Sequence, residues 1–482
     1  MAALSSCKPE DERITHSPGK KLEFASEWDS SGSTDSVKFG FILTGKLSAT
    51  RRLKVYNPNS EAVLITSVTK PGNAPYHFIV NGRDSRNGPI TNMTLRGNDS
   101  LWVLITVTPD TTDSDETLFI EDKLVFTTSG IARDQEIHLF AFGTNAHYVL
   151  EENLLPCNSV WDDLKRPYVL YGFPTVEPGC TLTIKPGVRV LAYQNSGLYV
   201  RGTVNAVGTF DKPITFAGTR LESWFENTGG QWGQILIVGA SKGNRFNYCI
   251  IKNGVRGIQV DTPNTYTNMR PEVEIGNTVI KNMSDIGIFS FGGVVNCYNT
   301  LVTDCATGLV YCLEGGKYFF VHCTMAYTNT LALIRRDPCV IFADSYDRNG
   351  DGSGYAYDSL VLGFTNNLVT GSADSEIAVS RKSNFNLGVY ENGLNNNVLK
   401  LPVADTGLFK TNNTAQNIFV RYDISSLPGR YRYNFMPDTT FIGRGKALTY
   451  KAPTINAFES LLKKDLRDSA RKETNADIGA YQ

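Results

Sequence analysis

The sequence predicts an all-β fold, with an N-terminal immunoglobulin-like β-sandwich followed by a right-handed parallel β-helix. Two observations support this prediction. Between residues 37 and 148, short runs of β-branched and aromatic residues alternate with turn residues, as is typical of sandwiches. Beyond residue 148, the phrase "NTVIKNMSDIG" at 277–287 returns as "NTLVTDCATG" at 299–308. A repeat of this kind indicates one structural unit stacked on copies of itself.

Residues 1–36 are polar and rich in turn formers, as in "SEWDSSGSTDS", and we expect a lipoprotein-type N-terminus and flexible tether there. The sandwich is expected over residues 37–148. Its clearest predicted strands are RRLKVYN (51–57), AVLITSV (62–68), HFIVNG (77–82), LWVLITVTP (101–109), DKLVFTT (122–128) and IHLFAFG (137–143). Modules of this kind act as spacers or interaction modules. The scattered residues His77, His138 and His147 are therefore expected to be structural.

The β-helix is expected over residues 149–482, together with a C-terminal closing segment. No helical period lasts long enough there to supply crossover helices, so parallel strands must be joined by tight bends. Aligning the repeated phrase predicts one stacked apolar column, made of Ile251, Ile280, Val302, Met325 and Val369. The wide interval between Met325 and Val369 leaves room for one additional, irregular coil.

A second predicted column lies three residues before the apolar one. Its members are Tyr248, Asn277, Asn299, His322 and Asn366. Stacked coils place equivalent residues about 4.8 Å apart, so side-chain amides can bond from coil to coil. We therefore interpret these asparagines as a folding device at the bends. His322 is assigned an inward or bend position.

Charge and hydropathy exclude two classes of partner. The formal net charge is −1 and no run of Lys or Arg stands out, which argues against a nucleic-acid partner. No stretch approaches the roughly 20 apolar residues of a membrane-spanning helix. Any membrane contact is therefore expected only through an N-terminal lipid anchor.

The beginning of the chain suggests such an anchor. "LSSC" at 4–7 resembles the end of a bacterial lipobox, in which Cys7 would carry the lipid. The acidic run at 10–12 resembles the surface-export signal of Bacteroidetes lipoproteins. The resemblance implies a lipoprotein on the outer face of the outer membrane.

Longer phrases extend this resemblance over nearly the whole chain. They are RPYVLYG (166–172), TLTIKPGVRV (181–190), GLYVRGTVNAVGT (197–209), GGQWGQI (229–235), GGKYFFVHCT (315–324) and the terminal DIGAYQ (477–482). Together they resemble a family of Bacteroidetes surface lipoproteins with a pectate-lyase-like parallel β-helix. The resemblance implies fold and surface location but no reaction. Because "DLRDSAR" at 465–471 lacks the glycine of the family pattern, we expect an irregular C-terminal closure.

The chain has nine cysteines. If Cys7 carries a lipid, eight remain, and that even number permits disulfides without requiring them. No spacing suggests zinc. Several cysteines occupy apolar repeat positions, where a free thiol behaves as a small buried hydrophobe, so mostly buried thiols are expected.

Three hypotheses about function follow from a surface β-helix. The first is a non-catalytic glycan-binding or adhesive protein, in which aromatic side chains stack on sugar rings. The candidate aromatic residues are Tyr193, Tyr199, Trp224 and Trp232, each of which has core packing as its alternative role. The second is a polysaccharide lyase or glycoside hydrolase acting on an acidic polysaccharide. The third is a subunit of a surface assembly.

The enzyme hypothesis needs clustered carboxylates with a basic residue, because fold alone does not imply catalysis. Asp285 and Asp304 lie on neighbouring predicted coils but at different positions within them. Glu314, His322 and the pair Arg335-Arg336 follow. Because this pattern does not place two carboxylates at hydrolytic spacing, we assign no catalytic residue from the sequence.

One motif suggests calcium. "DRNGDGSGYAYD" at 347–358 places oxygen ligands at Asp347, Asn349, Asp351, Ser353 and Asp358. This is the spacing at which a tight loop turns alternate oxygens toward one centre. The same Gly and Asp content also suits a simple solvated turn between coils. Both interpretations stay open, and calcium is the only cofactor that the sequence suggests.

Overall fold

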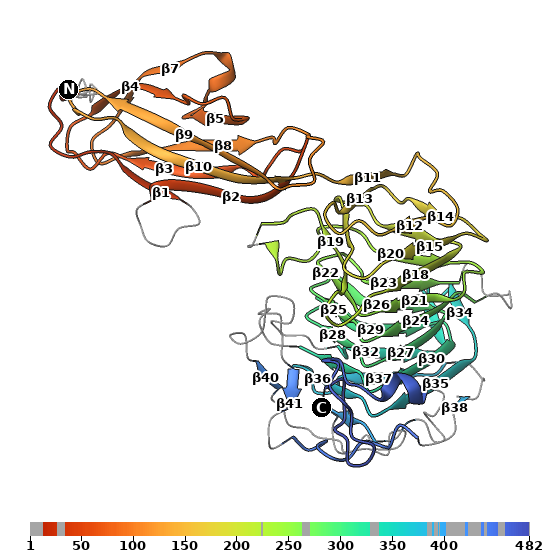
Figure 1. The fold of residues 1–482 in the computed structure, drawn as a ribbon. Coiled ribbons are helices and arrows are strands. Elements are labelled where there is room, and N and C mark those ends of the chain that lie inside the picture. Colours follow the sequence, from red (N-terminus) through yellow and green to blue (C-terminus); the bar gives the residue numbers. More distant parts are fainter. Residues whose placement is uncertain are drawn as a thin grey trace. The chain divides into compact units, whose positions relative to one another are not determined.

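The computed structural model describes residues 13–26, 34–222, 225–262, 270–327, 337–382, 388–389, 394, 396–401, 420–422, 435–437, 441–451 and 458–481. The chain divides into two compact units (Figure 1), one of Met1–Ala146 with Arg220–Ser223 and one of His147–Thr219 with Trp224–Gln482. The main division therefore lies at 146/147 rather than at 148/149, because a strand of the second unit begins at His147.

The first unit is a β-sandwich of two five-stranded sheets. One sheet has the order β1 (Glu23–Ser26), β3 (Arg51–Tyr56), β8 (Ser100–Val107), β5 (Tyr76–Val80) and β6 (Arg83–Asp84). The other has the order β2 (Ser36–Leu43), β10 (Gln135–Thr144), β9 (Leu118–Thr128), β4 (Val63–Thr69) and β7 (Ile90–Leu95). A 3-10 turn at Ser85–Asn87 follows β6. All six predicted strands are present.

The predicted tether is too long. Strand β1 pairs antiparallel with β3, and Leu22 and Phe24 are buried in the sandwich core. Ile14 also forms a bridge to Ala62. These contacts arise because "KLEFAS" alternates apolar and polar residues over only a few positions, a signal too short to separate a strand from a polar linker.

The second unit is a parallel β-helix with three long sheets (Figure 1). Sheet 1 contains β11 (His147–Leu150), β13 (Tyr168–Tyr171), β16 (Arg189–Ala192), β19 (Ile214–Gly218), β22 (Cys249–Lys252), β25 (Val279–Lys281), β28 (Leu301–Thr303), β31 (Thr324–Ala326), β36 (Leu368–Thr370) and β39 (Val398–Leu399). Sheet 2 contains β12 (Val160–Trp161), β15 (Thr181–Ile184), β18 (Thr203–Val207), β21 (Asn244–Asn247), β24 (Glu272–Gly276), β27 (Val294–Tyr298), β30 (Gly316–Val321), β35 (Leu360–Thr365) and β38 (Gly388–Val389). Sheet 3 contains β14 (Thr175–Val176), β17 (Leu198–Val200), β20 (Ile235–Val238), β23 (Ile258–Asp261), β26 (Ile286–Phe291), β29 (Gly308–Leu313), β32 (Val340–Ala343) and β37 (Ile377–Ser380).

The predicted register of sheet 1 is confirmed. Ile251 pairs with Ile280, Ile280 with Val302, Val302 with Met325, and Met325 with Val369. These five side chains are fully buried in the helix core. The additional coil expected between Met325 and Val369 is wrong, because these two residues are direct neighbours. The extra residues instead enlarge one coil, in part through a hairpin of β33 (Ser345–Asp347) and β34 (Tyr355–Tyr357).

The asparagine column forms the bends that lead into sheet 1. Every member has a positive φ, from 45° at Asn299 to 59° at Asn366, in the left-handed region that asparagine tolerates better than most residues. Asn299 donates its amide to Asn277 Oδ1 at 3.2 Å, which confirms the predicted amide ladder. His322 takes the same bend with φ 54° and is fully buried.

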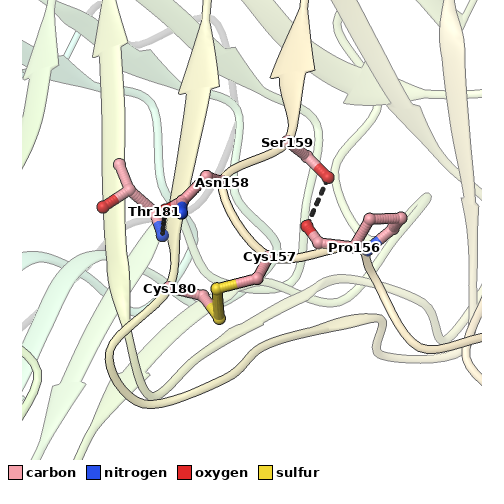
Figure 2. Close-up of a disulfide and its surroundings, with 6 residues drawn as sticks. All are labelled: Pro156, Cys157, Asn158, Ser159, Cys180 and Thr181. Atoms are coloured by element: carbon pink, nitrogen blue, oxygen red, sulfur yellow. Dashed lines mark hydrogen bonds between the residues drawn. A yellow bond between two sulfur atoms is a disulfide. The ribbon is translucent and has the colours of Figure 1, made fainter.

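Cysteines occur in two states. Cys157 and Cys180 form a disulfide between the first two coils, just before the paired strands β12 and β15 (Figure 2). Beside it, the amide of Thr181 donates to Asn158 Oδ1 at 3.2 Å. The remaining described cysteines are buried free thiols, as expected: Cys249, Cys297, Cys305, Cys312, Cys323 and Cys339.

The C-terminal residues 441–451 and 458–481, hereafter the strap, run along the outside of sheet 1 and contain α1 (Glu459–Leu462). Leu466, Ala480 and Tyr481 pack on the outward residues Val279 and Leu301. The strap is therefore the predicted closing segment, but it closes the side of the β-helix. A separate two-stranded sheet joins β40 (Val420–Tyr422) to β41 (Phe435–Pro437).

Polar contacts fix the strap to the asparagine column. Asn299 donates to the carbonyl of Lys464 at 2.7 Å and accepts from Arg471 Nη2 at 3.0 Å. Asn366 exchanges two hydrogen bonds with the backbone of Leu448. The bends thus supply the side chains that hold the covering segment.

No helix in the described part of the chain is long and apolar enough to span a membrane.

Candidate functional site

The outer surface of sheet 3 carries a dense group of charged and aromatic side chains. Successive residues of a strand point to opposite faces, so every second residue of β23, β26 and β29 faces outward. The inward residues Val260 and Val310 belong to the core. The outward positions align in two columns: Gln259, Phe289, Tyr311 and Ile341 in one, and Asp261, Phe291 and Leu313 in the other.

Aromatic residues form the base of this surface. The rings of Phe289 and Phe291 meet edge to face with centroids 4.6 Å apart. Tyr346, on the hairpin strand β33, brings its ring to 5.2 Å from Phe291 and is 38% exposed. Leu313 and Tyr311 join the same apolar group. This cluster lies outside the β-helix core, so its apolar area must be covered by something other than the three sheets.

Two arginines cover it. The Arg256 guanidinium lies 4.6 Å from the centre of the Phe289 ring, and that of Arg348 lies 5.5 Å from the Phe291 ring. Cations at these distances are attracted to the ring faces. Arg348 also pairs with both oxygens of the buried Glu314. We name Arg256, Asp261, Phe289, Phe291, Glu314, Tyr346 and Arg348 the arginine–aromatic face.

Each arginine here also has a fixed acceptor. Arg256 donates from Nε to Asp285 Oδ2 and from Nη1 to Gln259 Oε1, both at 2.7 Å. The hydrogen bonds and charge of Glu314 raise the pKa of Arg348. Charge-assisted bonds of this kind orient the planar guanidinium groups, so the face presents polar groups in set directions.

Asp261 differs from the other carboxylates. Burial raises its pKa, the Glu314 charge raises it further, and the Arg348 charge opposes both. Within the described residues, its buried Oδ1 has no hydrogen-bond partner. The neighbouring Thr262 is only 6% exposed, and its Oγ1 also lacks a partner. Two polar atoms on consecutive residues are thus buried without the hydrogen bonds that such groups normally make.

The predicted calcium loop forms the tip of the β33–β34 hairpin beside this face. Asp347 accepts from the amide of Gly352 at 2.6 Å, and Asp351 accepts from the amide of Ser353 at 2.9 Å. Asn349 donates to the Ser353 hydroxyl at 3.1 Å. Asp358 instead forms an ion pair with Arg270.

In the structure the predicted calcium ligands take part in turn and ion-pair contacts. Among the residues that the structure describes, no group of three or more His, Cys, Asp or Glu side chains is arranged to hold a metal ion. This geometry favours the turn interpretation. Calcium binding itself stays a prediction.

The predicted glycan-stacking aromatics do not share a surface strip. Trp232 is 2% exposed and donates its indole N–H to the carbonyl of Lys252, so the prediction that it stacks on sugar is wrong. Tyr199 is half-buried on β17. Tyr193 is exposed and stacks on Tyr171 with ring centres 5.0 Å apart. Trp224 lies outside the described residues, as does Cys7.

The acidic and basic candidates are also separated. Asp304 is buried at a bend with φ 52°, and His322 is buried beneath the strap, where its Nδ1 contacts the Gly479 carbonyl. Arg335 and Arg336 lie outside the described residues. Glu314 and Asp285 do belong to the region of the arginine–aromatic face. Asp261, Arg256 and the phenylalanine pair were not among the predicted site residues, although the alternation in "IGIFSF" marks the two phenylalanines as outward-facing.

Comparisons with known proteins do not assign the chain to a family. No family model matches it, and no curated protein matches it. Among solved structures, a protein of unknown function from Porphyromonas gingivalis is 12% identical, with a TM-score of 0.18, over 25% of this chain and 46% of that one. A family 123 glycoside hydrolase from Clostridium perfringens is 10% identical, with a TM-score of 0.20, over 30% and 31%.

The CooA pilin subunit from Escherichia coli is 11% identical, with a TM-score of 0.19, over 26% of this chain and 99% of the pilin. The chain thus spans less than half the length of the first two similar structures. Likenesses with TM-scores this low carry no argument about activity.

Proposed function

We propose that this protein is a cell-surface glycan-binding protein, and that the arginine–aromatic face is its binding surface. One observation carries the proposal. An outward aromatic cluster is covered by oriented arginine–carboxylate pairs and adjoins two buried polar atoms that lack partners, Asp261 Oδ1 and Thr262 Oγ1. Glycans present both kinds of complementary group, namely hydroxyls and apolar C–H faces.

The chemistry of the face suits a hydroxyl-rich ligand. Aromatic rings contact apolar patches of a ligand and supply most of the buried area. A few fixed polar groups then set orientation and specificity. The outward edges of Arg256 and Arg348, whose side chains are partly exposed, can donate to ring and hydroxyl oxygens of a sugar. Tyr346 adds an exposed ring on the hairpin beside them.

We propose binding without catalysis, because the carboxylates of this face are mostly paired. Asp285 accepts from Arg256, and Glu314 from Arg348. One observation supports a second candidate, a lyase or hydrolase of acidic polysaccharides. The raised pKa of Asp261 is the property of a general acid, and Glu314 is a second carboxylate in the same charge network.

We further propose a surface location through a lipid on Cys7. The Cys157–Cys180 disulfide supports an oxidising compartment outside the cytosol, where such bonds persist. In a host that processes lipoproteins, Cys7→Ala is expected to move the protein from the membrane fraction to the soluble fraction. Full retention of the variant in the membrane fraction would contradict the anchor.

The binding proposal is tested by a glycan array followed by titration calorimetry with the best ligand. Phe291→Ala and Arg348→Gln should each weaken binding about tenfold or more, because each removes an oriented contact. Arg245→Gln is the matched control, since Arg245 lies on β21 of sheet 2 and forms an ion pair with Glu274 at 3.3 Å. Retained affinity in both test variants, at unchanged melting temperature, would refute the assignment.

A parallel assay for new reducing ends or unsaturated products separates the two candidates. Binding without product supports the lectin-like function. Product that disappears in Asp261→Asn, while binding persists, would replace it with the enzyme function.

A further inference from the structure

A second candidate site lies on sheet 1, at the end that the strap does not cover. The outward column of this sheet runs Arg189, Thr215, Ile250 and Val279 along successive coils. Val279 is buried under the strap. Ile250, one coil earlier, is half-buried and lines a cavity of about 350 Å³. The cavity therefore opens where the covering segment ends.

The wall of the cavity combines two cations with apolar surface. Its lining includes Arg189 and Lys212 together with Leu164, Pro213 and Ile250. Gly187 lies between them: a Cβ there would come within 3.3 Å of Leu164 and 3.5 Å of Lys212. A larger residue would crowd the cavity, and the positive φ of 87° at this position further favours glycine.

Neither cation forms an ion pair with a carboxylate among the described residues. Arg189 donates from Nη2 to the carbonyl of Lys165 at 2.8 Å, and neither Arg189 nor Lys212 lies within ion-pair distance of a described carboxylate. The charge of Asp163 raises the pKa of Arg189 and so opposes the effect of burial. That carboxylate already accepts from His147 Nε2 at 2.8 Å and from the amides of Lys165 and Arg166.

This arrangement contrasts with the arginines of sheet 3. Arg201, Arg256 and Arg348 are each paired with a carboxylate. Arg189 is more buried than an exposed surface arginine, and this burial lowers its pKa. Asp163 supplies part of the opposing charge, but it already accepts hydrogen bonds from His147 and two backbone amides. A bound anion would add negative charge beside the half-buried Arg189 and the exposed Lys212.

We propose that this cavity is a binding site for the carboxylate of an acidic sugar. Arg189 and Lys212 would hold the carboxylate, and the Thr215 hydroxyl would bond a ring oxygen or hydroxyl. Leu164, Pro213 and Ile250 would contact the apolar face of the sugar ring. The volume fits the lower end of small-molecule sites, which suits one sugar unit. The sugar part rests on the proposed glycan binding, whereas the anion part rests on the cavity alone.

The test is an NMR or calorimetric titration of the whole protein with galacturonate, galactose and inorganic sulfate. Galacturonate should bind, and galactose should bind at least about tenfold more weakly, because a charge-assisted pair is lost. Binding should weaken as salt rises. Sulfate that binds as tightly as galacturonate would overturn the sugar assignment, and absence of binding by both acids would overturn the site.

Single substitutions test whether galacturonate binds in this cavity. Arg189→Gln should weaken galacturonate binding about tenfold, and Lys212→Gln several-fold. Lys185→Gln removes the same charge from a nearby exposed position outside the cavity lining, and should leave affinity within about twofold. Equal loss in all three variants would refute the site.

Phe291→Ala, on sheet 3, should leave galacturonate affinity unchanged. The experiments can therefore refute glycan binding at the arginine–aromatic face and acidic-sugar binding in this cavity separately. Loss of galacturonate binding in Phe291→Ala would overturn the cavity assignment.

Discussion

Sheet 1 and sheet 3 of the β-helix differ in what covers the apolar residues on their outer faces. Both carry apolar residues on their outer faces, since the columns continue through the stacked coils. On sheet 1, Val279, Leu301 and Leu368 are covered by the strap. On sheet 3, Phe289 and Phe291 are covered by guanidinium groups. A covering chain segment hides a face, whereas covering ion pairs leave oriented polar groups accessible to a ligand.

The difference suggests how function is divided. Sheet 1 is structural along the length of the strap. In the coils before Ile250 the outward residues Val169, Leu191 and Ala217 are also buried, and the cationic cavity lies beside the column of Arg189, Thr215 and Ile250. On sheet 3 the accessible groups are the ring of Tyr346 and the arginine side chains that cover Phe289 and Phe291. We therefore propose that ligands bind at the sheet 3 face and, beyond the end of the strap on sheet 1, in the cationic cavity.

The largest expected effect comes from disrupting the β-helix core, which supports both sheets. Ile280 is fully buried in the core. Ile280→Asp places an unpaired charge there, which is expected to destabilise the β-helix by about 5 kcal/mol or more, enough to unfold it. Circular dichroism and size-exclusion chromatography measure the outcome. A folded, monomeric variant with an unchanged melting temperature would contradict the stacked register.

The next largest effect is a loss of stability on sheet 1, from a change that weakens the strap and leaves sheet 3 intact. Ile478 is fully buried against Leu368 and Val398. Ile478→Ala should lower the free energy of unfolding by about 2–4 kcal/mol and expose the strap to limited proteolysis. Ile442→Ala is the matched control, because Ile442 is 39% exposed. Glycan binding at sheet 3 should persist in both variants. Equal protease resistance of Ile478→Ala and the parent would argue against a stabilising strap.

A pH effect tests the contact between His322 and the strap. Asn366 Nδ2 can only donate, so the His322 Nε2 at 3.0 Å must accept, and Nδ1–H donates to the Gly479 carbonyl. Burial lowers the pKa of His322, and the Arg471 charge lowers it further. A folded-state pKa below the unfolded value means that this stability is present above about pH 6.5 and is lost as pH falls.

His322→Asn should therefore reduce the loss of stability between about pH 6.5 and pH 5, because asparagine does not titrate and suits this bend. Urea denaturation at several pH values measures this. The same slope in the variant and the parent would refute the titration of His322.

On sheet 3, the pH dependence of stability is expected to have the opposite sign. The pKa of Asp261 is raised, so its folded form favours the proton. The associated stability is present below the unfolded aspartate pKa of about 4 and is lost as pH rises through the folded value. Asp261→Asn should thus raise the melting temperature at pH 7, with a smaller gain near pH 4. A lower melting temperature at pH 7 would show that the carboxylate is stabilising.

The smallest effect concerns the hairpin beside sheet 3. Asp347 and Asp351 accept hydrogen bonds within their own turn. If the turn interpretation holds, titration of the metal-stripped protein with calcium should release no heat. A saturable heat that disappears in Asp347→Ala with Asp351→Ala would establish the calcium site instead.

The sequence predicted the interior of the β-helix better than its exterior. Ile251, Ile280 and Val302 could be aligned because each coil repeats the same buried environment, which constrains residue type at a fixed spacing. The bend asparagines were predictable for the same reason. Trp232 was misassigned because an aromatic residue in a repeat has the same local signal whether it faces inward or outward.

The arginine–aromatic face could not be predicted because its residues come from different coils and from the hairpin. Arg348 reaches Glu314 across 34 positions of the sequence, and no periodic signal connects them. A closing segment was predicted, but its course along the side of sheet 1 was not, because its contacts with Asn299 join residues more than 160 positions apart. Only the two-residue alternation around Phe289 and Phe291 gave a local indication.

The most direct test of the division between the two sheets is hydrogen–deuterium exchange with and without the best array ligand. If the sheet 3 face binds glycan, protection should concentrate in residues 256–262, 286–291 and 308–314 and in the hairpin around Arg348. The strap should exchange at the same rate in both states. Protection confined to the strap or to the sandwich, with unchanged exchange along β23, β26 and β29, would contradict the assignment of binding to sheet 3.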